Sequence, residues 1–222
     1  MSTGIQWTDE TWNPLRARHK ETGAEGWACV RVSPGCVNCY AATLNASKRW
    51  ERGTGEDYTV PGLSRVETYL DEKTLAQPLR WSKPRRVFVC SMTDLFGEWV
   101  TDEEIDRIFA VMALAPQHTF QVLTKRPERM RKYLTDHLPF PGWTYEGGPW
   151  REALERVRKA ILGMLRLAPV QALNAAAAWH EEHYPDADPS FLPVWPLPNV
   201  WLGVSAEDQE RADERIPLLL DT

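Results

Sequence analysis

Three of the four cysteines in this chain fall within eleven residues, as Cys29, Cys36 and Cys39. Thiolates are soft ligands that favour zinc, copper(I) and iron–sulfur clusters. Three cysteines leave one iron of a four-iron cluster without a protein ligand, and such an iron can bind a cofactor. Because cysteines grouped in this way more often hold metal than form disulfides in a reducing compartment, the spacing indicates a metal or cluster site.

The fourth cysteine, Cys90, lies far from this group in the apolar run of residues 86–91. A free cysteine among apolar neighbours commonly packs as a small hydrophobic residue, and we favour that role here. If Cys90 instead reached the metal, four thiolates would close the site and indicate a structural zinc, since structural zinc sites are four-coordinate. The residues alone leave both metals open.

Strand-like and helix-like segments alternate along the chain, which is typical of βα units. Apolar, β-branched runs predict strands at 86–91, 119–124 and 199–205, and a further strand is expected to begin at 5–7. With that strand in place, the cysteines follow the first strand, and the chain holds four strand-to-helix units. Between the units, we expect a helix over 40–52 and a mostly irregular connection over 53–84.

Three helices have recognisable starts. Thr101 and Glu104 form a capping box, in which a hydroxyl and a carboxylate accept hydrogen bonds from backbone N–H groups. Pro127 stands where a proline is tolerated in the first turn of a helix. Ser205 is expected to cap a charged helix that bends at Pro217.

Residues 136–198 break this rhythm with clusters of Pro, Gly and Trp around two predicted helices, near 151–167 and 170–183. An apolar stripe on the first of them indicates that it packs against another element. We interpret the segment as a helical insertion or lid. The predicted division is a (βα) part, residues 1–135 with 199–222, and the insertion, residues 136–198.

Two groups of polar side chains are assigned to the solvated surface. The segment 125–132 is the most basic in the chain, and a solvated helix face is favoured there over a phosphate or nucleic-acid contact. His180 and His183 face nearly the same side of a predicted helix, but no cysteine is near them. A solvated surface is therefore favoured there over a metal site.

Composition limits the classes of function. The formal net charge is −5 and the isoelectric point about 5.6, which does not suit a free-standing nucleic-acid binder. No uninterrupted apolar run is long enough for a membrane span, and the N-terminus lacks the pattern of a secretory signal. We expect a cytoplasmic protein with no membrane partner.

Four blocks of sequence carry a family resemblance, at residues 5–14, 32–41, 123–130 and 201–209. Together they resemble the phage gene-product 37 and 68 family, whose members carry a three-cysteine motif akin to that of radical S-adenosylmethionine (SAM) enzymes. The resemblance implies an α/β fold, a partial (βα) barrel with the cluster at the C-terminal mouth of its first strand. Active sites of such barrels lie at that mouth. The location it implies is the cytoplasm of a bacterial host cell.

The same resemblance implies a reaction. Cys29, Cys36 and Cys39 would each ligate one iron of a [4Fe-4S] cluster, and the fourth iron would bind the amine and carboxylate of SAM. An electron from a donor would cleave SAM to a 5′-deoxyadenosyl radical, which abstracts a hydrogen atom from the substrate. The substrate is not identified by the residues; a nucleic acid or nucleotide is one option, since tryptophan can stack on bases.

Further SAM-binding or substrate-binding candidates follow from their position at strand ends. Related barrels place polar groups after the second strand, against the methionine amine of SAM, and arginine suits a carboxylate or phosphate. Each candidate could instead cap a helix or face solvent. The candidates are Ser91, Thr93 and Asp94 after the second predicted strand, Thr124, Lys125 and Arg126 after the third, Ser205 and Glu207 after the fourth, and Tyr40 and Asn13.

Two features depart from the usual radical SAM pattern. Six residues separate the first two cysteines, a longer spacing than usual, and Asn38 rather than an aromatic residue precedes the third. The chain also stops at Thr222, which predicts a barrel truncated at its C-terminus with an exposed sheet edge. Two alternatives therefore stand: a noncatalytic, zinc-stabilised phage-encoded module that binds a partner protein or nucleic acid, and an inactive relative that cannot enclose SAM.

Overall fold

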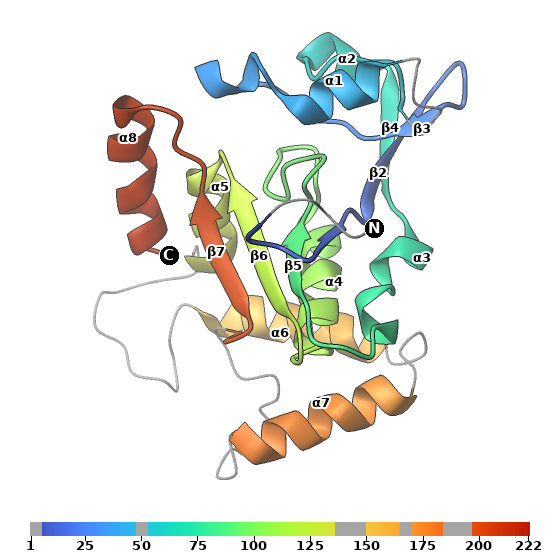
Figure 1. Ribbon diagram of the computed structural model, residues 1–222, viewed down its shortest axis with the longest axis vertical. Coiled ribbons are helices and arrows are strands. Elements are labelled where there is room, and N and C mark those ends of the chain that lie inside the picture. The colour runs from blue at the N-terminus through green and yellow to red at the C-terminus, as the bar shows by residue number, and fades with distance from the viewer. Residues whose placement is uncertain (1–5, 48–52, 136–149, 165–169, 184–196) are drawn as a thin grey trace.

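The computed structural model of the chain describes residues 6–47, 53–135, 150–164, 170–183 and 197–222. At its centre is a four-stranded parallel sheet with strand order β1-β5-β6-β7 (Figure 1). The fold is therefore α/β with a parallel sheet, as the sequence predicted. Its strands are β1 (Glu10–Trp12), β5 (Arg86–Val89), β6 (Thr119–Thr124) and β7 (Val200–Val204).

Three of these strands lie where the apolar runs predicted them, and the first does not. The predicted start at residues 5–7 is wrong for the described part, because residues 6 and 7 form a turn and β1 begins at Glu10. Glu10 pairs with Val87 of β5 in parallel register. The three-residue strand β1 thus depends on its neighbour for its conformation, which a local apolar pattern does not reveal.

A second, antiparallel sheet has the order β3-β2-β4 and lies beside α1 and α2 (Figure 1). The predicted irregular connection over 53–84 is therefore wrong, because it contains one of these strands and three short helices. The elements between β1 and β5 are β2 (Leu15–His19), β3 (Glu25–Gly26), η1 (Pro34–Cys36), α1 (Tyr40–Ala46), α2 (Val60–Ser64), β4 (Val66–Leu70), α3 (Glu72–Leu75) and η2 (Pro78–Arg80).

This second sheet also changes the place of the cysteines. They follow the β2-β3 hairpin and not, as predicted, the first strand of the parallel sheet directly. The helix predicted over 40–52 is shorter, since α1 ends at Ala46, and the last part of that prediction lies outside the described residues.

Three helices follow the strands of the parallel sheet: α4 (Asp102–Ala113), α5 (Pro127–Thr135) and α8 (Gln209–Leu220). The capping box of α4 is confirmed, because the Thr101 hydroxyl accepts from the Glu104 N–H and the Glu104 carboxylate accepts from the Thr101 N–H. The start of α5 at Pro127 is also confirmed. Ser205 is not the cap of α8, because Asp208 takes that role and accepts from the Arg211 N–H at 2.8 Å.

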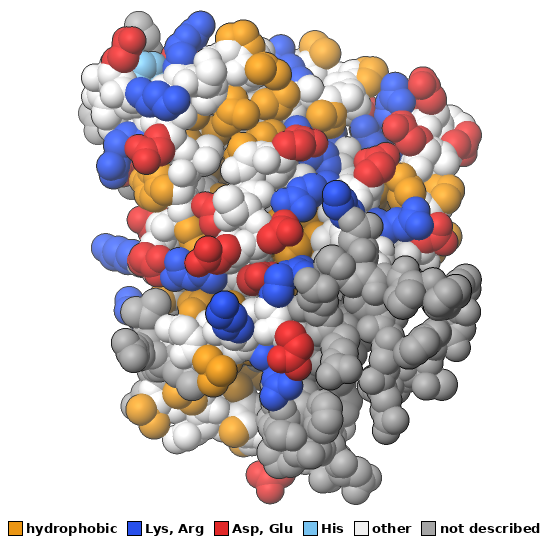
Figure 2. Space-filling view, turned by 180° about the vertical axis from the view of Figure 1, so that it is seen from behind, with side chains coloured by type: hydrophobic (Ala, Val, Ile, Leu, Met, Phe, Trp, Pro, Cys, Tyr) orange, Lys and Arg blue, Asp and Glu red, His pale blue; other side chains and the backbone are white. Residues whose placement is uncertain are grey.

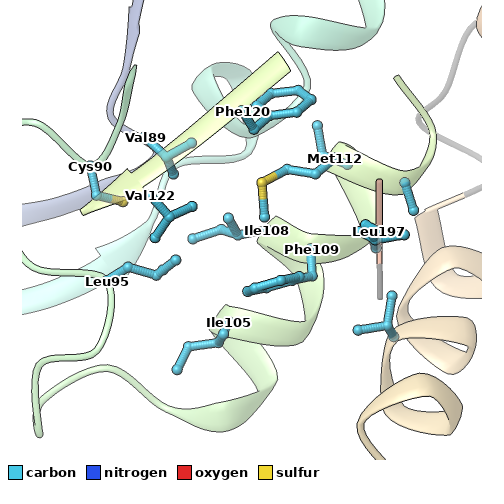
Figure 3. Packing of buried hydrophobic residues seen from close by; sticks show 14 of the residues in the cluster. Val89, Cys90, Leu95, Ile105, Ile108, Phe109, Met112, Phe120, Val122 and Leu197 are labelled. Carbon is cyan, nitrogen blue, oxygen red and sulfur yellow. The ribbon is translucent and has the colours of Figure 1, made fainter. Parts of the chain in front are cut away.

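The hydrophobic core lies between the parallel sheet and α4. Ile105, Ile108, Phe109 and Met112 share the inner face of α4, and each is at most 2% exposed. Figure 3 shows these side chains packed against Val122 of β6 and its neighbours. Apolar residues at helical spacing thus place α4 on the sheet, and their burial is the main source of stability here.

Two helices of the predicted insertion are described, α6 (Trp150–Met164) and α7 (Val170–His183). Both lie at the end of the parallel sheet opposite to α1 and α2 (Figure 1). Val157 of α6 is fully buried, and the Arg156 guanidinium donates to the Asp106 carboxylate of α4 at 3.2 Å. The predicted packing of this helix against another element is therefore confirmed.

The prediction of a solvated surface at the two histidines is wrong for His180. That side chain is buried at 7% exposure, whereas His183 is exposed and stacks on Trp179 at 4.2 Å between ring centroids.

Among the described helices, none combines the length and apolar character that crossing a membrane requires.

Candidate cysteine-lined site

A cavity of about 270 Å³ opens at the carboxyl ends of β5, β6 and β7. The segment from β3 to α1 crosses this end of the sheet (Figure 1). Described residues of α6 and α7 do not line the cavity. The residues predicted from sequence that line it are Cys29, Cys36, Cys39, Tyr40, Ser91, Thr93, Asp94, Thr124, Lys125, Arg126 and Ser205.

The three cysteines reach the cavity from different local elements. Cys29 lies in the extended segment after β3, Cys36 ends η1, and Cys39 is the N-cap residue of α1. All three are half-buried. Among the residues that the structure describes, no three His, Cys, Asp or Glu side chains are arranged to hold a single metal ion. The three thiols line the same cavity.

Two of these thiols differ in their ionisation. Burial raises the pKa of Cys29 to about 12, and the negative charge of Asp94 acts in the same direction. Burial alone would also raise the pKa of Cys36, but hydrogen bonds with the Val32 and Ser33 backbone lower it below its usual value. The Cys36 thiolate therefore forms more readily than the Cys29 thiolate.

Asp94 and Arg126 bind each other inside the protein. The Asp94 carboxylate accepts from the Thr124 hydroxyl at 2.7 Å, from the Lys125 N–H at 3.0 Å and from Arg126 Nη1 at 3.2 Å. Arg126 is only 4% exposed. This network joins the ends of β5 and β6, so both charged groups have partners within the chain.

Hydroxyl groups join the cysteine segment to the loop after β5. The Tyr40 hydroxyl donates to the Ser91 carbonyl at 2.6 Å, and the Tyr58 hydroxyl donates to the Met92 carbonyl. Sequence reasoning missed Tyr58, because it lies in the stretch predicted to be irregular. The signal available was Thr59, a good N-cap residue just before the proline at 61, and it marked α2.

Asn13 and Glu207 do not line the cavity, although both touch residues that do. The Asn13 side chain exchanges hydrogen bonds with the Ser91 hydroxyl and accepts from the Met92 N–H at 3.0 Å. Glu207 accepts from the Gly35 N–H at 3.3 Å. Both side chains therefore hold the backbone around the cavity.

The Glu207 carboxylate is strongly acidic. Burial opposes its ionisation, but hydrogen bonds from Ser33 and Gly35, together with the charge of Arg215, lower the pKa of Glu207 to about 2. It is therefore an anion throughout the neutral pH range, and its hydrogen bonds to the cysteine segment are charge-assisted.

Cys90 packs in the hydrophobic core, as predicted, at 3% exposure (Figure 3). It does not lie in mid-strand, because β5 ends at Val89. Its φ of 54° makes it the non-glycine residue with positive φ within the described ranges. This conformation is rare for residues with a Cβ, and it turns the chain away from the sheet at the wall of the cavity.

The predicted solvated helix face over 125–132 is wrong for two of its arginines. Arg126 is buried in the network with Asp94, and Arg129 donates to the Val100 carbonyl at 3.1 Å and to the Asp102 carboxylate at 2.7 Å. On the described part of the face in Figure 2, basic and acidic side chains are interspersed. The described part of the molecular surface in Figure 2 therefore presents no extended region of one charge.

The fold and site define an α/β protein with a cysteine-lined cavity at the carboxyl ends of a parallel sheet. Residues 2–222 match the model of the family described as "Protein of unknown function (DUF5131)", and the chain belongs to that family. No curated protein matches the sequence. No solved structure matches it.

Proposed function

We propose that the chain binds a [4Fe-4S] cluster through Cys29, Cys36 and Cys39 and uses it to cleave SAM. The observation that carries the proposal is the convergence of these three thiols on one cavity at the carboxyl ends of parallel strands. Cofactor sites of (βα) barrels occupy this position. The resemblance to radical SAM-like phage proteins supports the same assignment.

The topology supports a partial barrel of the radical SAM type. Parallel strands that are neighbours in sequence order are neighbours in space, in the order β1-β5-β6-β7. A barrel adds its strands in this way, whereas an open doubly wound sheet reverses its order at a switch point. A helix follows each of the last three strands.

The number of proposed ligands, three cysteines, suits a four-iron cluster with one open iron better than a structural zinc ion. Zinc in a structural site draws four ligands to one centre at about 2.3 Å from each sulfur. A four-iron cluster binds each thiolate at a different iron, so its cysteines are spread around a larger body. In the described residues the cysteines line one cavity but do not form a single-ion ligand set.

Cys29, Cys36 and Cys39 would hold the cluster, and its chemistry when bound would be the one-electron reductive cleavage of a carbon–sulfur bond of SAM, with the electron taken from a low-potential donor, to give methionine and a 5′-deoxyadenosyl radical. Lys125 supplies a cation on the cavity wall for a carboxylate. Ser91 and Ser205 also line the cavity. Phe88 and Tyr58 add apolar surface, which limits the access of water to a reactive radical.

Anaerobic purification followed by iron and sulfide analysis tests this proposal. We expect a brown protein whose iron is lost in each of the variants Cys29→Ala, Cys36→Ala and Cys39→Ala. Cys90→Ala removes a thiol that is 3% exposed at the wall of the same cavity, and it is expected to keep its iron, which separates the three proposed ligands from the fourth cysteine. Incubation of the loaded wild-type protein with SAM and dithionite is expected to release 5′-deoxyadenosine.

Two results would contradict parts of the proposal. A colourless protein with one equivalent of zinc would replace the cluster with a structural metal. A loaded cluster without release of 5′-deoxyadenosine would leave a cluster-binding protein that does not cleave SAM.

A further inference from the structure

The segment that carries the cysteines has little regular structure of its own. Between the end of β3 at Gly26 and the start of α1 at Tyr40, its one regular element is the three-residue η1. No strand ladder holds the backbone on either side of Cys29. The position of the backbone around Cys29 must therefore come from contacts with other parts of the chain.

Cys29 is held on both sides by side chains from the parallel sheet. The Thr93 hydroxyl, which follows β5, donates to the carbonyl of Ala28. Arg126, which follows β6, donates from Nη2 to the carbonyl of Val30 at 2.8 Å. The two carbonyls that flank Cys29 are thus bound from the ends of two neighbouring strands.

Each of the three guanidinium nitrogens of Arg126 donates one hydrogen bond within the chain. Its Nε donates to Glu98 at 3.0 Å and its Nη1 to Asp94 at 3.2 Å, in addition to the contact with Val30. Its Cζ also lies 4.8 Å from the centroid of the Trp99 ring. An anion in the cavity would compete with Asp94 for the Arg126 charge, and separating this buried ion pair is costly.

A third contact holds the segment just before Cys36. Glu207, which follows β7, accepts from the Gly35 N–H at 3.3 Å and pairs with Arg215 at 3.1 Å. The Arg215 side chain is 4% exposed and also donates to the Ser205 carbonyl at 2.6 Å. A Cβ at Gly35 would come within 2.9 Å of the Glu207 side chain, so the close approach requires glycine.

We infer that Thr93, Arg126 and Glu207 are positioning residues that fix the backbone around Cys29 and Cys36, and that they do not bind the cofactor or substrate. Each comes from the carboxyl end of a different strand, so the parallel sheet sets the separation of the thiols. That the thiols are held for a cluster rests on the proposed function. That these side chains hold the segment does not depend on it.

Amide hydrogen exchange on the metal-free protein tests the inference. In Thr93→Val, peptides covering residues 27–33 are expected to exchange up to about tenfold faster than in the wild type, since one lost hydrogen bond is worth about 0.5–1.5 kcal/mol. In Arg126→Met, which loses three hydrogen bonds, the same peptides are expected to exchange at least as fast. In Glu207→Ala the same is expected for residues 33–37, and Glu207→Gln, which keeps an acceptor oxygen, is expected to restore most of the protection. Arg129→Met, three residues further along the chain in α5, is the control and leaves both peptides unchanged.

Iron retention in the anaerobically purified variants is the second readout. Reduced iron content in Thr93→Val, together with faster exchange, supports positioning of cluster ligands. Faster exchange with no iron in any form, the wild type included, defeats the proposed function but keeps the positioning role. Unchanged exchange in Thr93→Val and Glu207→Ala overturns the inference, and these two variants decide the matter should Arg126→Met fail to fold.

Discussion

Two regions of this molecule are held together by different forces. The parallel sheet with α4 and α6 encloses one large apolar cluster that includes Ile105, Phe109 and Phe120. We define the cysteine lobe as residues 15–70; apart from Leu15 and Leu70, which pack in the large cluster, the apolar residues described in it form small clusters. One of these consists of Ala17, Ala28 and Val66. Apolar burial thus specifies the sheet, whereas the lobe relies on polar contacts.

Asn45 shows how the lobe compensates for its small apolar core. It is 1% exposed, and its Oδ1 accepts from the N–H groups of Trp27 and Thr54 at 2.9 and 3.2 Å. Its Nδ2 donates to the Thr54 hydroxyl and the Glu56 carbonyl. One amide therefore joins α1 to two neighbouring segments. Because of this difference, we expect the cysteine lobe to open locally at a lower free energy than the parallel sheet.

The largest expected effect comes from the sheet side of this comparison. Phe109→Ala removes a side chain that is 2% exposed and should reduce the free energy of unfolding by about 3–5 kcal/mol through lost burial and a cavity. Urea denaturation measures the loss. Leu162→Ala, at a side chain 68% exposed in α6, is the control and should change stability by no more than about 0.5 kcal/mol. Equal effects of the two substitutions would contradict a core centred on α4.

The second prediction tests the polar contacts of the cysteine lobe. Asn45→Ala leaves buried donors and acceptors without a partner, which costs about 1–3 kcal/mol. Hydrogen exchange should accelerate in residues 26–47 and 53–58 while β6 remains protected. Asn174→Ala, at an exposed position of α7, serves as the control. Equal acceleration in β6 would show that lobe and sheet unfold as one unit.

The smallest expected effect is a dependence of stability on pH, and it arises from His118 just before β6. Burial lowers the pKa of His118, which opposes protonation in the folded state. Its Nε2 lies 3.1 Å from the Pro78 carbonyl, and within the described residues its buried Nδ1 has no hydrogen-bond partner. Because the unfolded chain binds this proton more readily, His118 should reduce stability as pH falls below about 6.5. Denaturation of wild type and His118→Gln at pH 7.5 and 5.5 measures this, and equal losses in both would exclude His118 as the cause.

The sequence predicts those parts of the fold in which local pattern and tertiary structure agree. Strand β6 has the predicted bounds, 119–124, because its apolar run is buried between neighbours on both sides. Strand β4 was missed, since Val66–Leu70 mixes Glu and Thr with apolar residues and forms its pairs with β2, about fifty residues earlier. Pairing over such a distance leaves no local signal.

At the candidate site, too, features with a local sequence pattern could be predicted and contacts between distant residues could not. Most polar candidates chosen for their position at strand ends line one cavity, whereas the cysteines reach it from the segment after β3 and not, as predicted, from the end of the first parallel strand. The roles of Arg126 and Glu207 could not be read in this way, because their partners Val30 and Gly35 lie 96 and 172 positions away. A charged residue after a strand looks the same in sequence whether it meets a ligand or a backbone group of its own chain.

The contact between Gly35 and Glu207 has a consequence for the order of events during synthesis. The two residues are 172 positions apart, so the ribosome adds the cysteines long before it adds Glu207, whose carboxylate accepts a hydrogen bond from the Gly35 N–H. A nascent chain can bury the α4 face early, since β5, α4 and β6 are consecutive, but it cannot complete the cysteine segment. The contact between Gly35 and Glu207 therefore forms only after most of the chain has been synthesised.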